Sequence, residues 1–189
     1  MKAAPPPRYP SELASAITTR DGTTLHLRPI RPDDAASLIE FHRSLSPRSV
    51  YRRFFFVHPT LSAAEVERFT HVDYDTRLAL VVEADGRLLA VGRYEGAPAA
   101  MEAEVAFVVA DEHQHHGIAT ILLEHLARAG HDRGITTFVA STLAENRAML
   151  DVFAHSGFAV TTSVDQGIVN VRFPIGPRTP SEPSASRRQ

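Results

Sequence analysis

The sequence has no cysteine among its 189 residues, which excludes a disulfide framework, a thiolate zinc site and a cysteine nucleophile. It also has no apolar run close to the roughly 18–20 residues that a membrane-spanning helix requires, so we expect no membrane partner. The opening residues, MKAAPPPRYP, place proline where a secretory signal peptide needs an apolar stretch. These absences favour a cytoplasmic protein.

Lysine is almost absent, and neither sign of charge is in large excess. Lys2 is the only lysine, and 20 basic residues face 22 acidic ones, for a net charge of -2. There is no dense basic block in the middle of the chain, so nucleic acid is not the expected partner. The hydrophobic share of 43% and the charged share of 22% are ordinary for a globular protein and exclude a disordered, collagen-like or coiled-coil chain.

The length and the composition of the two ends predict a single domain between tails. A chain of this size can bury roughly 70% of its unfolded surface in one core. Residues 3–10 are rich in proline, and residues 177–189 are rich in proline, serine and arginine without hydrophobic periodicity. We expect flexible tails over residues 1–14 and 177–189, and one domain over residues 15–176.

The first third of this domain is predicted to be helical after one strand. Alternating apolar residues at 24–28 predict the strand, and the proline and two acids of residues 32–34 are typical of a first helical turn. Ser46-Pro47 ends this helix, and a short helix follows through residue 55. Ser62 and Glu65 have the spacing of a capping box, which predicts a further helix over residues 63–71.

Strands dominate the middle of the chain. The apolar runs 78–83 and 88–94 flank an Ala-Asp-Gly-Arg turn, and residues 102–109 alternate as a third neighbouring strand, so three antiparallel strands are expected. The order then changes to helix, strand, helix, strand. The expected elements are helices over residues 117–133 and 145–156 and strands over residues 137–140, 158–162 and 168–173.

The stretch from Val105 to Leu123 carries the clearest chemical signal. A strand leads into a short polar loop, which leads into a helix whose first turn contains Gly117 and Ala119. The free N–H groups of a first helical turn attract anions, and small residues let a phosphate approach closely. The pattern therefore predicts an anion site that a diphosphate would fit.

The pattern Gln114-x-x-Gly117-x-Ala119 resembles the acetyl-CoA diphosphate loop of the GNAT superfamily of N-acetyltransferases, which reads Gln/Arg-x-x-Gly-x-Gly/Ala. Asn146 and Gly157-Phe158 stand where that superfamily has an asparagine that opens a helix ending in Gly-Phe. The resemblance covers roughly residues 24–173. It implies an α/β (α+β) GNAT fold: one mixed, mostly antiparallel sheet of about six to seven strands, flanked by helices and splayed at the acetyl-CoA site.

Within this superfamily the chain looks closest to the bacterial Pat-like protein lysine acetyltransferase domains. The resemblance lies in the segments Leu-Ser-Pro-Arg-Ser at residues 45–49, Tyr-Arg-Arg-Phe-Phe at 51–55, Arg-Phe-Thr-His-Val-Asp at 68–73 and Ala-Glu-Val-Ala-Phe at 103–107. It implies that acetyl-CoA is the cosubstrate and that a protein lysine side chain accepts the acetyl group.

The resemblance also implies a role for each matching residue. Diphosphate binding falls on the loop and first helical turn, namely Gln114, His115, His116, Gly117, Ile118, Ala119 and Thr120. The pantetheine arm would pair with the strand residues Phe107, Val108 and Val109. The second helix would complete the cofactor site with Asn146, Met149 and Phe153.

Glu104 is the expected general base, because it matches the glutamate of the Ala-Glu-Val/Ile-Ala stretch of Pat-like enzymes. A lysine ammonium has a pKa of about 10.4 and must lose a proton before it attacks a thioester, so a nearby carboxylate suits the reaction. Glu102, two residues away on the same strand face, is the alternative. Neither a cysteine nor a Gly-x-Ser-x-Gly elbow is present, so we expect direct transfer in a ternary complex.

Two departures from the family pattern affect the expected site. Phe153 stands where many GNAT enzymes carry the tyrosine that protonates the leaving thiolate, so water is left to supply that proton. His115 and His116 stand where the loop usually has glycine and then arginine or lysine. Imidazoles pair best with phosphate when charged, so we expect acetyl-CoA affinity to weaken as the pH rises through about 6.5.

Some assignments remain open in the sequence. His113, His115 and His116 raise a metal alternative, but adjacent imidazoles on one turn seldom converge, so we expect no metal. Arg52 and Arg53 are better explained as the solvated face of an amphipathic helix than as a substrate entrance. A small-molecule amine acetyltransferase and a non-catalytic acyl-CoA-binding sensor remain as alternative functions, and the protein is expected to be a monomer or a homodimer.

Overall fold

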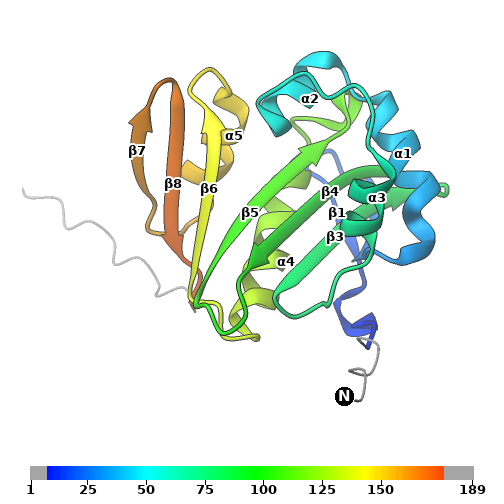
Figure 1. The fold of residues 1–189 in the computed structure, drawn as a ribbon, viewed down its shortest axis with the longest axis horizontal. Coiled ribbons are helices and arrows are strands. Elements are labelled where there is room, and N and C mark those ends of the chain that lie inside the picture. The colour runs from blue at the N-terminus through cyan, green and yellow to red at the C-terminus, as the bar shows by residue number, and fades with distance from the viewer. Residues whose placement is uncertain (1–7, 177–189) are drawn as a thin grey trace, which may run out of the picture.

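One twisted sheet organises the chain. In the computed structural model, which describes residues 8–176, eight strands lie in the order β1-β2-β3-β4-β5-β6-β8-β7 (Figure 1). Neighbouring strands are antiparallel except β5 and β6, which are parallel. This confirms the predicted mixed, mostly antiparallel sheet. The expectations for residues 1–7 and 177–189 lie outside the described residues.

The elements follow the predicted order. The strands are β1 (Ser15–Thr18), β2 (Thr24–Pro29), β3 (Arg77–Ala84), β4 (Arg87–Gly96), β5 (Glu102–Val109), β6 (Thr137–Leu143), β7 (Thr161–Asp165) and β8 (Ile168–Pro174). The α-helices are α1 (Ala35–Ser44), α2 (Pro47–Phe54), α3 (Ala63–Thr70), α4 (Ile118–His131) and α5 (Arg147–Ala154). Three short 3-10 helices are η1 (Ser11–Leu13), η2 (Pro32–Asp34) and η3 (Asp111–His113).

The sheet has eight strands where about six to seven were expected, and the additional strand is β1. Only Ile17 of this short edge strand is buried, so its sequence carries little hydrophobic alternation. The expected N-terminal tail also ends earlier than residue 14. Tyr9 donates a hydrogen bond from its hydroxyl to the carbonyl of Pro29 at 3.0 Å and packs edge-on against Tyr74. Its neighbour Arg31 lies over its ring.

The strand that was expected over residues 158–162 begins instead at Thr161. Gly157 turns the chain with a φ of 77°, and Phe158 then packs into the core with its ring stacked on that of Phe173 at 5.4 Å. Phe158 thus packs against the core before the strand begins, and pairing starts three residues later.

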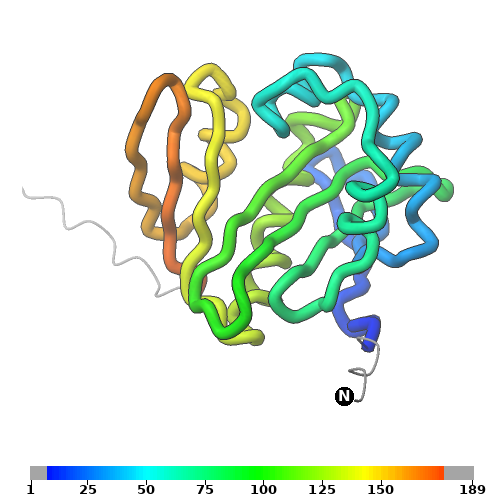
Figure 2. The backbone as a smooth tube through the Cα atoms, in the orientation of Figure 1, coloured from blue at the N-terminus to red at the C-terminus, as the bar shows by residue number. Residues whose placement is uncertain are grey.

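The sheet splits between β5 and β6. The two strands pair at only three positions, Glu102 with Thr137, Ala103 with Phe138 and Glu104 with Val139. Beyond Glu104 they separate into a large leaf, β1 to β5, and a small leaf, β6, β8 and β7 (Figure 2). After Glu104, the edge of β5 that faces β6 has no strand partner among residues 8–176.

Helices cover the two leaves differently. On the large leaf, α1 lies against β4 on one face, while α4 packs on β3, β4 and β5 from the other (Figure 1). Gly92 of β4 allows this approach of α4, because a Cβ at Gly92 would lie 3.1 Å from Leu126 and 3.0 Å from Phe107. On the small leaf, α5 packs through Phe153 onto Phe173 of β8, with ring centroids 5.7 Å apart. Within the described part of the chain, none of the helices is long and apolar enough to cross a membrane.

A buried ion pair ties β2 to the start of α1. Arg28 and Asp34 are each 7% exposed, and the guanidinium donates to both carboxylate oxygens, at 2.7 and 2.8 Å. Arg28 also donates to Glu83 of β3 at 2.7 Å. The hydrogen bond to Asp34 raises the pKa of Arg28 above its ordinary value. Arg28 therefore joins β2, the 3-10 helix that precedes α1, and β3.

We expect Asp34→Asn to lower the free energy of unfolding by about 3 kcal/mol, because it leaves a buried guanidinium with only half of its partners. Urea unfolding followed by circular dichroism measures this change. Asp33→Asn is the matched control, since Asp33 is the exposed neighbour in the same 3-10 helix. Equal losses from the two variants would show that the buried pair has no special contribution.

Candidate functional site

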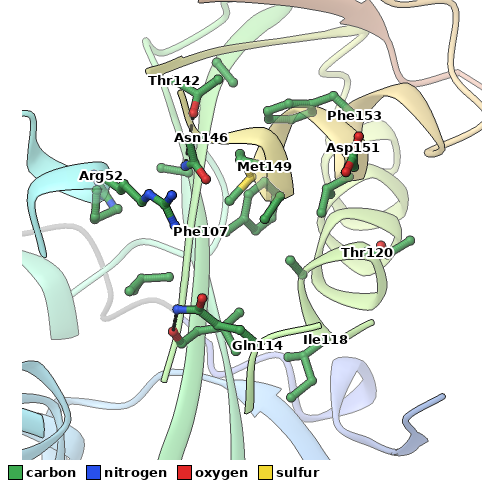
Figure 3. Close-up of a pocket in the computed structure, with 18 of the residues that line it drawn as sticks. Arg52, Phe107, Gln114, Ile118, Thr120, Thr142, Asn146, Met149, Asp151 and Phe153 are labelled. Carbon is green, nitrogen blue, oxygen red and sulfur yellow. Dashed lines mark hydrogen bonds between the residues drawn. The ribbon is translucent and has the colours of Figure 1, made fainter. Parts of the chain in front are cut away.

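A cavity of about 500 Å³ opens where β5 and β6 separate (Figure 3). Its walls come from β5, the loop from η3 to α4, the start of α4, β6, α5 and α2. This volume lies in the range of sites that bind small molecules or cofactors. The split of the sheet, rather than a single loop, therefore creates this cavity.

The N-terminus of α4 lines one end of this cavity. Gly117 precedes the helix with a φ of +88°, in the left-handed region that favours glycine. The first helical residues, Ile118, Ala119 and Thr120, border the cavity, and their N–H groups belong to the helical turn that has no internal acceptor. The stretch for which an anion site was predicted thus forms a helix N-terminus that opens into a cavity.

Gln114 shapes the loop with its side chain. Its amide donates to the hydroxyl of Ser49 at 3.0 Å and to the carbonyl of Val109 at 3.1 Å. Asp111 of the same loop accepts from the backbone N–H and the hydroxyl of Ser46 and from the hydroxyl of Ser49. Burial raises the pKa of Asp111, but these hydrogen bonds outweigh it and hold the pKa below its ordinary value. The loop is therefore fastened to the start of α2.

The three histidines between β5 and α4 lie in different surroundings. His113 and His115 line the cavity, and His115 has a φ of 68°. His116 does not line it, because its Nδ1 pairs with Asp21 of the β1–β2 turn at 3.0 Å. Of the two histidines that replace the usual loop residues, only His115 is placed to contact a ligand. No group of three or more histidine, aspartate or glutamate side chains that could hold a metal ion occurs within residues 8–176.

The strand residues predicted for the site lie along the split edge. Phe107, Val108 and Val109 all border the cavity, on the part of β5 that follows its pairing with β6. Because backbone groups on an unpaired edge are free to bond an extended ligand, this edge can receive a chain of alternating donors and acceptors.

Glu104 lies at the point where β5 leaves β6. Its side chain is exposed and borders both the cavity and a second, open groove of about 480 Å³ across β6, β8 and β7. Glu102, in contrast, forms an ion pair with Arg172 of β8 and borders neither hollow. Of the two candidate carboxylates, Glu104 alone therefore faces the space where a substrate can lie.

The second helix closes the cavity on the side of the small leaf. Asn146 is buried and donates from its amide to the hydroxyl of Thr142 at 3.3 Å. Met149 and Phe153 line the wall beside it (Figure 3). Phe153 is 3% exposed, with its ring 6.5 Å from that of Phe107 across the split. All four tyrosines lie within residues 8–176, and none of them borders the cavity.

Three arginines that were not among the predicted site residues border the cavity. Arg52 and Arg53 of α2, which were expected on a solvated helix face, are partly buried and line it, and Arg52 reaches toward it from α2 (Figure 3). Arg20 comes from the β1–β2 turn and lies against Gly117, where a Cβ would be 3.2 Å from its Cγ. No spacing along the chain connects these arginines to the loop, so only the fold could reveal them.

Sequence comparisons identify relatives with a shared description. A family model described as "Acetyltransferase (GNAT) domain" matches residues 24–159. Acetyltransferase PA5475 of Pseudomonas aeruginosa is 31% identical over 142 residues, which cover 73% of this chain and 76% of the relative. Acetyltransferase Pat of Mycolicibacterium smegmatis is 32% identical over 173 residues, which cover 88% of this chain and 51% of the relative. The chain thus spans about half the length of Pat.

Solved structures show the same arrangement of elements. The crystal structure of the GNAT domain of S. lividans PAT matches with a TM-score of 0.83 and 40% identity, covering 88% of this chain and 99% of that one. A putative acetyltransferase from Salmonella typhimurium, solved with acetyl-CoA, matches with a TM-score of 0.62 over 79% of this chain and 91% of that one. At 17% identity this second match concerns the fold alone.

Proposed function

Because the chain belongs to the GNAT family of acetyltransferases, we propose that it transfers the acetyl group of acetyl-CoA to a lysine side chain of a protein, with Glu104 as the general base. The observation that carries this proposal is the cavity itself. It joins an unpaired strand edge, a helix N-terminus that follows a glycine with positive φ, and the exposed carboxylate of Glu104. The likeness to Pat-like relatives supports the lysine acceptor.

The cavity fits the parts of acetyl-CoA in order along β5. The diphosphate suits the first turn of α4, where unpaired N–H groups and the cation of Arg20 meet. The pantetheine arm suits the unpaired edge at Phe107 to Val109, since its amides can continue the sheet. The thioester would then lie toward Phe153 and Glu104.

The open groove gives the acceptor a route to Glu104 that the donor does not occupy. Because its carboxylate borders the open groove as well as the cavity, an amine can approach across the small leaf while the donor lies in the split. This arrangement supports a ternary complex. Glu104 takes a proton from the ammonium, and the amine nitrogen attacks the thioester carbon. The carbon–sulfur bond then breaks, the nitrogen gives up its extra proton to water, and the thiolate leaves as coenzyme A with a proton from water.

Turnover on a panel of acceptors tests the proposed function. Released thiol is measured with acetyl-CoA and either lysine-containing proteins or small amines. Turnover on proteins alone supports the lysine proposal, and turnover on small amines alone replaces it with the small-molecule alternative. Tight binding of acetyl-CoA without turnover on any acceptor would indicate a non-catalytic sensor.

We expect Arg20→Ala to weaken acetyl-CoA binding about tenfold, because the variant loses a charge-assisted contact to the diphosphate. Isothermal titration calorimetry measures the dissociation constant. Arg43→Ala, at an exposed position of α1, removes the same charge elsewhere and is expected to bind as the wild type does. S-acetylpantetheine has no diphosphate, so its binding should be equal in the wild type and in Arg20→Ala. A loss for both donors would contradict the assigned contact.

A further inference from the structure

Two arginines beside the reaction site have fewer partners than their charges require. Arg93 of β4 is 6% exposed, and its closest carboxylate is Glu95, at 3.5 Å from its Nη1. Glu95 is shared, because Arg68 forms an ion pair with it as well. The Nη1 of Arg93 makes no hydrogen bond with the described residues. Its Nη2 donates to the carbonyl of Phe69 at 3.5 Å, and its guanidinium lies over the Phe69 ring at 4.1 Å, so Nη1 is the nitrogen left without a hydrogen bond.

Arg53 of α2 has still fewer partners. It forms no hydrogen bond or ion pair with any residue in the range 8–176, and its guanidinium lies over the ring of Phe54 at 5.0 Å. Burial lowers the pKa of Arg53, although the nearby charges of Glu104 and Glu95 partly offset it. Burial also lowers the pKa of Arg93 to about 9, and the charge of Arg53 adds to that effect. The fold thus holds two guanidinium groups close enough to repel each other.

These two arginines share a small cavity of about 30 Å³ next to the large one. Most of its lining is apolar, including Phe41, Phe54 and Phe69. Arg53, Ala106 and Val108 border both cavities, so the small cavity adjoins the space assigned to the substrates. This volume leaves room for a small polar group about the size of a water molecule. A mostly apolar cavity bordered by two incompletely paired guanidinium groups suits a planar anion that can accept paired hydrogen bonds.

The strand register places this cavity close to Glu104. Arg93 lies opposite Ala106 and Glu95 lies opposite Glu104 in the pairing of β4 with β5. Arg93 and Glu104 are therefore diagonal neighbours on one face of the sheet, at a separation of about 7–8 Å. A substrate only a few bonds long can span that distance.

We propose that Arg53 and Arg93 form a subsite for a carboxylate group that one of the two substrates brings to Glu104. This inference rests on the proposed acetyl transfer, and it adds a preference for an anionic substrate. The carboxylate can belong to the acceptor, as an acidic group next to the amine. It can also belong to the donor, as the far end of a dicarboxylic acyl chain. The chemistry recognised at the subsite is the same in both cases.

Binding of a small carboxylate tests the subsite without any turnover. Propionate is titrated at constant ionic strength, thermal unfolding is followed, and neutral propionamide serves as the isosteric control. We expect propionate to raise the unfolding temperature and propionamide to leave it unchanged. We also expect the propionate effect to disappear in Arg53→Met and in Arg93→Lys, which keeps the charge without the planar fork. Arg87→Met, at the exposed start of β4, should keep the effect.

Substrate pairs then identify which substrate carries the carboxylate. As donors, succinyl-CoA is compared with butyryl-CoA. As acceptors, L-lysine is compared with L-lysinamide, and an acetylated Lys-Asp dipeptide amide is compared with its Lys-Asn counterpart. A preference of at least fivefold in kcat/KM for one carboxylate member, lost in Arg53→Met, assigns the source. Preferences below fivefold in every pair, or one that survives Arg53→Met, overturn the proposal.

The proposed transfer and the subsite can fail separately. If acetyl-CoA binds but no acceptor is turned over, the proposed function fails, and the subsite is judged by the propionate titration. An equal effect of propionate and propionamide, or a propionate effect that persists in both arginine variants, overturns the subsite even if acetyl transfer is confirmed.

Discussion

Glu104→Gln is expected to lower kcat for acetyl transfer by about 100-fold or more, while acetyl-CoA binds with unchanged affinity. Glutamine has nearly the shape of glutamate but cannot take up the proton of the acceptor ammonium, and general bases typically contribute about 10²–10⁴ to a rate. Glu104 borders the cavity at the split of the sheet, whereas the diphosphate site lies at the N-terminus of α4. The measurement combines released thiol with calorimetric binding of acetyl-CoA.

The pH profile distinguishes a base from a structural residue. Since an amine loses its own proton as the pH approaches its pKa of about 10.4, the deficit of Glu104→Gln should shrink at alkaline pH. Glu102→Gln is the matched control, because Glu102 lies on the same strand face and pairs with Arg172. If Glu104→Gln retains more than a third of wild-type kcat, or if Glu102→Gln loses as much, the assignment of the base is wrong.

Gly117→Val is expected to weaken acetyl-CoA binding by about 100-fold, equivalent to about 2.7 kcal/mol. A β-branched residue is strongly disfavoured at a φ of +88°, and a Cβ here would meet Arg20 at 3.2 Å. The first turn of α4 must then shift away from the diphosphate, and Arg20 must move as well. Titration calorimetry measures the affinity, and circular dichroism shows whether the variant is folded.

Gly134→Val separates strain from binding. Gly134 follows α4 with a φ of +82°, and a Cβ at this position meets no atom within 4 Å. Gly134→Val therefore introduces a similar backbone strain away from the cavity, and it should bind acetyl-CoA as the wild type does. Similar losses of affinity in both variants would mean that Gly117 acts through stability alone.

Local signals in the sequence predicted much of the fold. The alternation of residues 102–109 predicted β5 with the bounds that the structure shows. Ser62 and Glu65 predicted the start of α3, and both reciprocal hydrogen bonds of the capping box are present. Ile17 alone could not predict β1, because a short edge strand with one buried residue has no clear period.

Residues that line the cavity could be predicted where they lie in a short continuous motif. They could not be predicted where the fold brings them together from distant segments. The strand residues and Gly117 belong to one continuous stretch, Phe153 lies in the helix of a second motif, and all of them border one cavity. The orientation of His116 depends on Asp21, which reaches it from the β1–β2 turn. Hydrogen bonding of Thr19 to Asp21 lowers the pKa of that carboxyl to about 2. Because Asp21 and His116 are far apart in the sequence, no short motif could predict their contact.

The brief parallel contact between β5 and β6 has a mechanical consequence for the proposed reaction. Three residue pairs join the two leaves on either side of the cavity, whereas antiparallel pairing within each leaf is longer. Such a junction is suited to act as a hinge, since little backbone bonding opposes a change in the angle between the leaves. Coenzyme A bound along β5 and against α5 would touch both leaves.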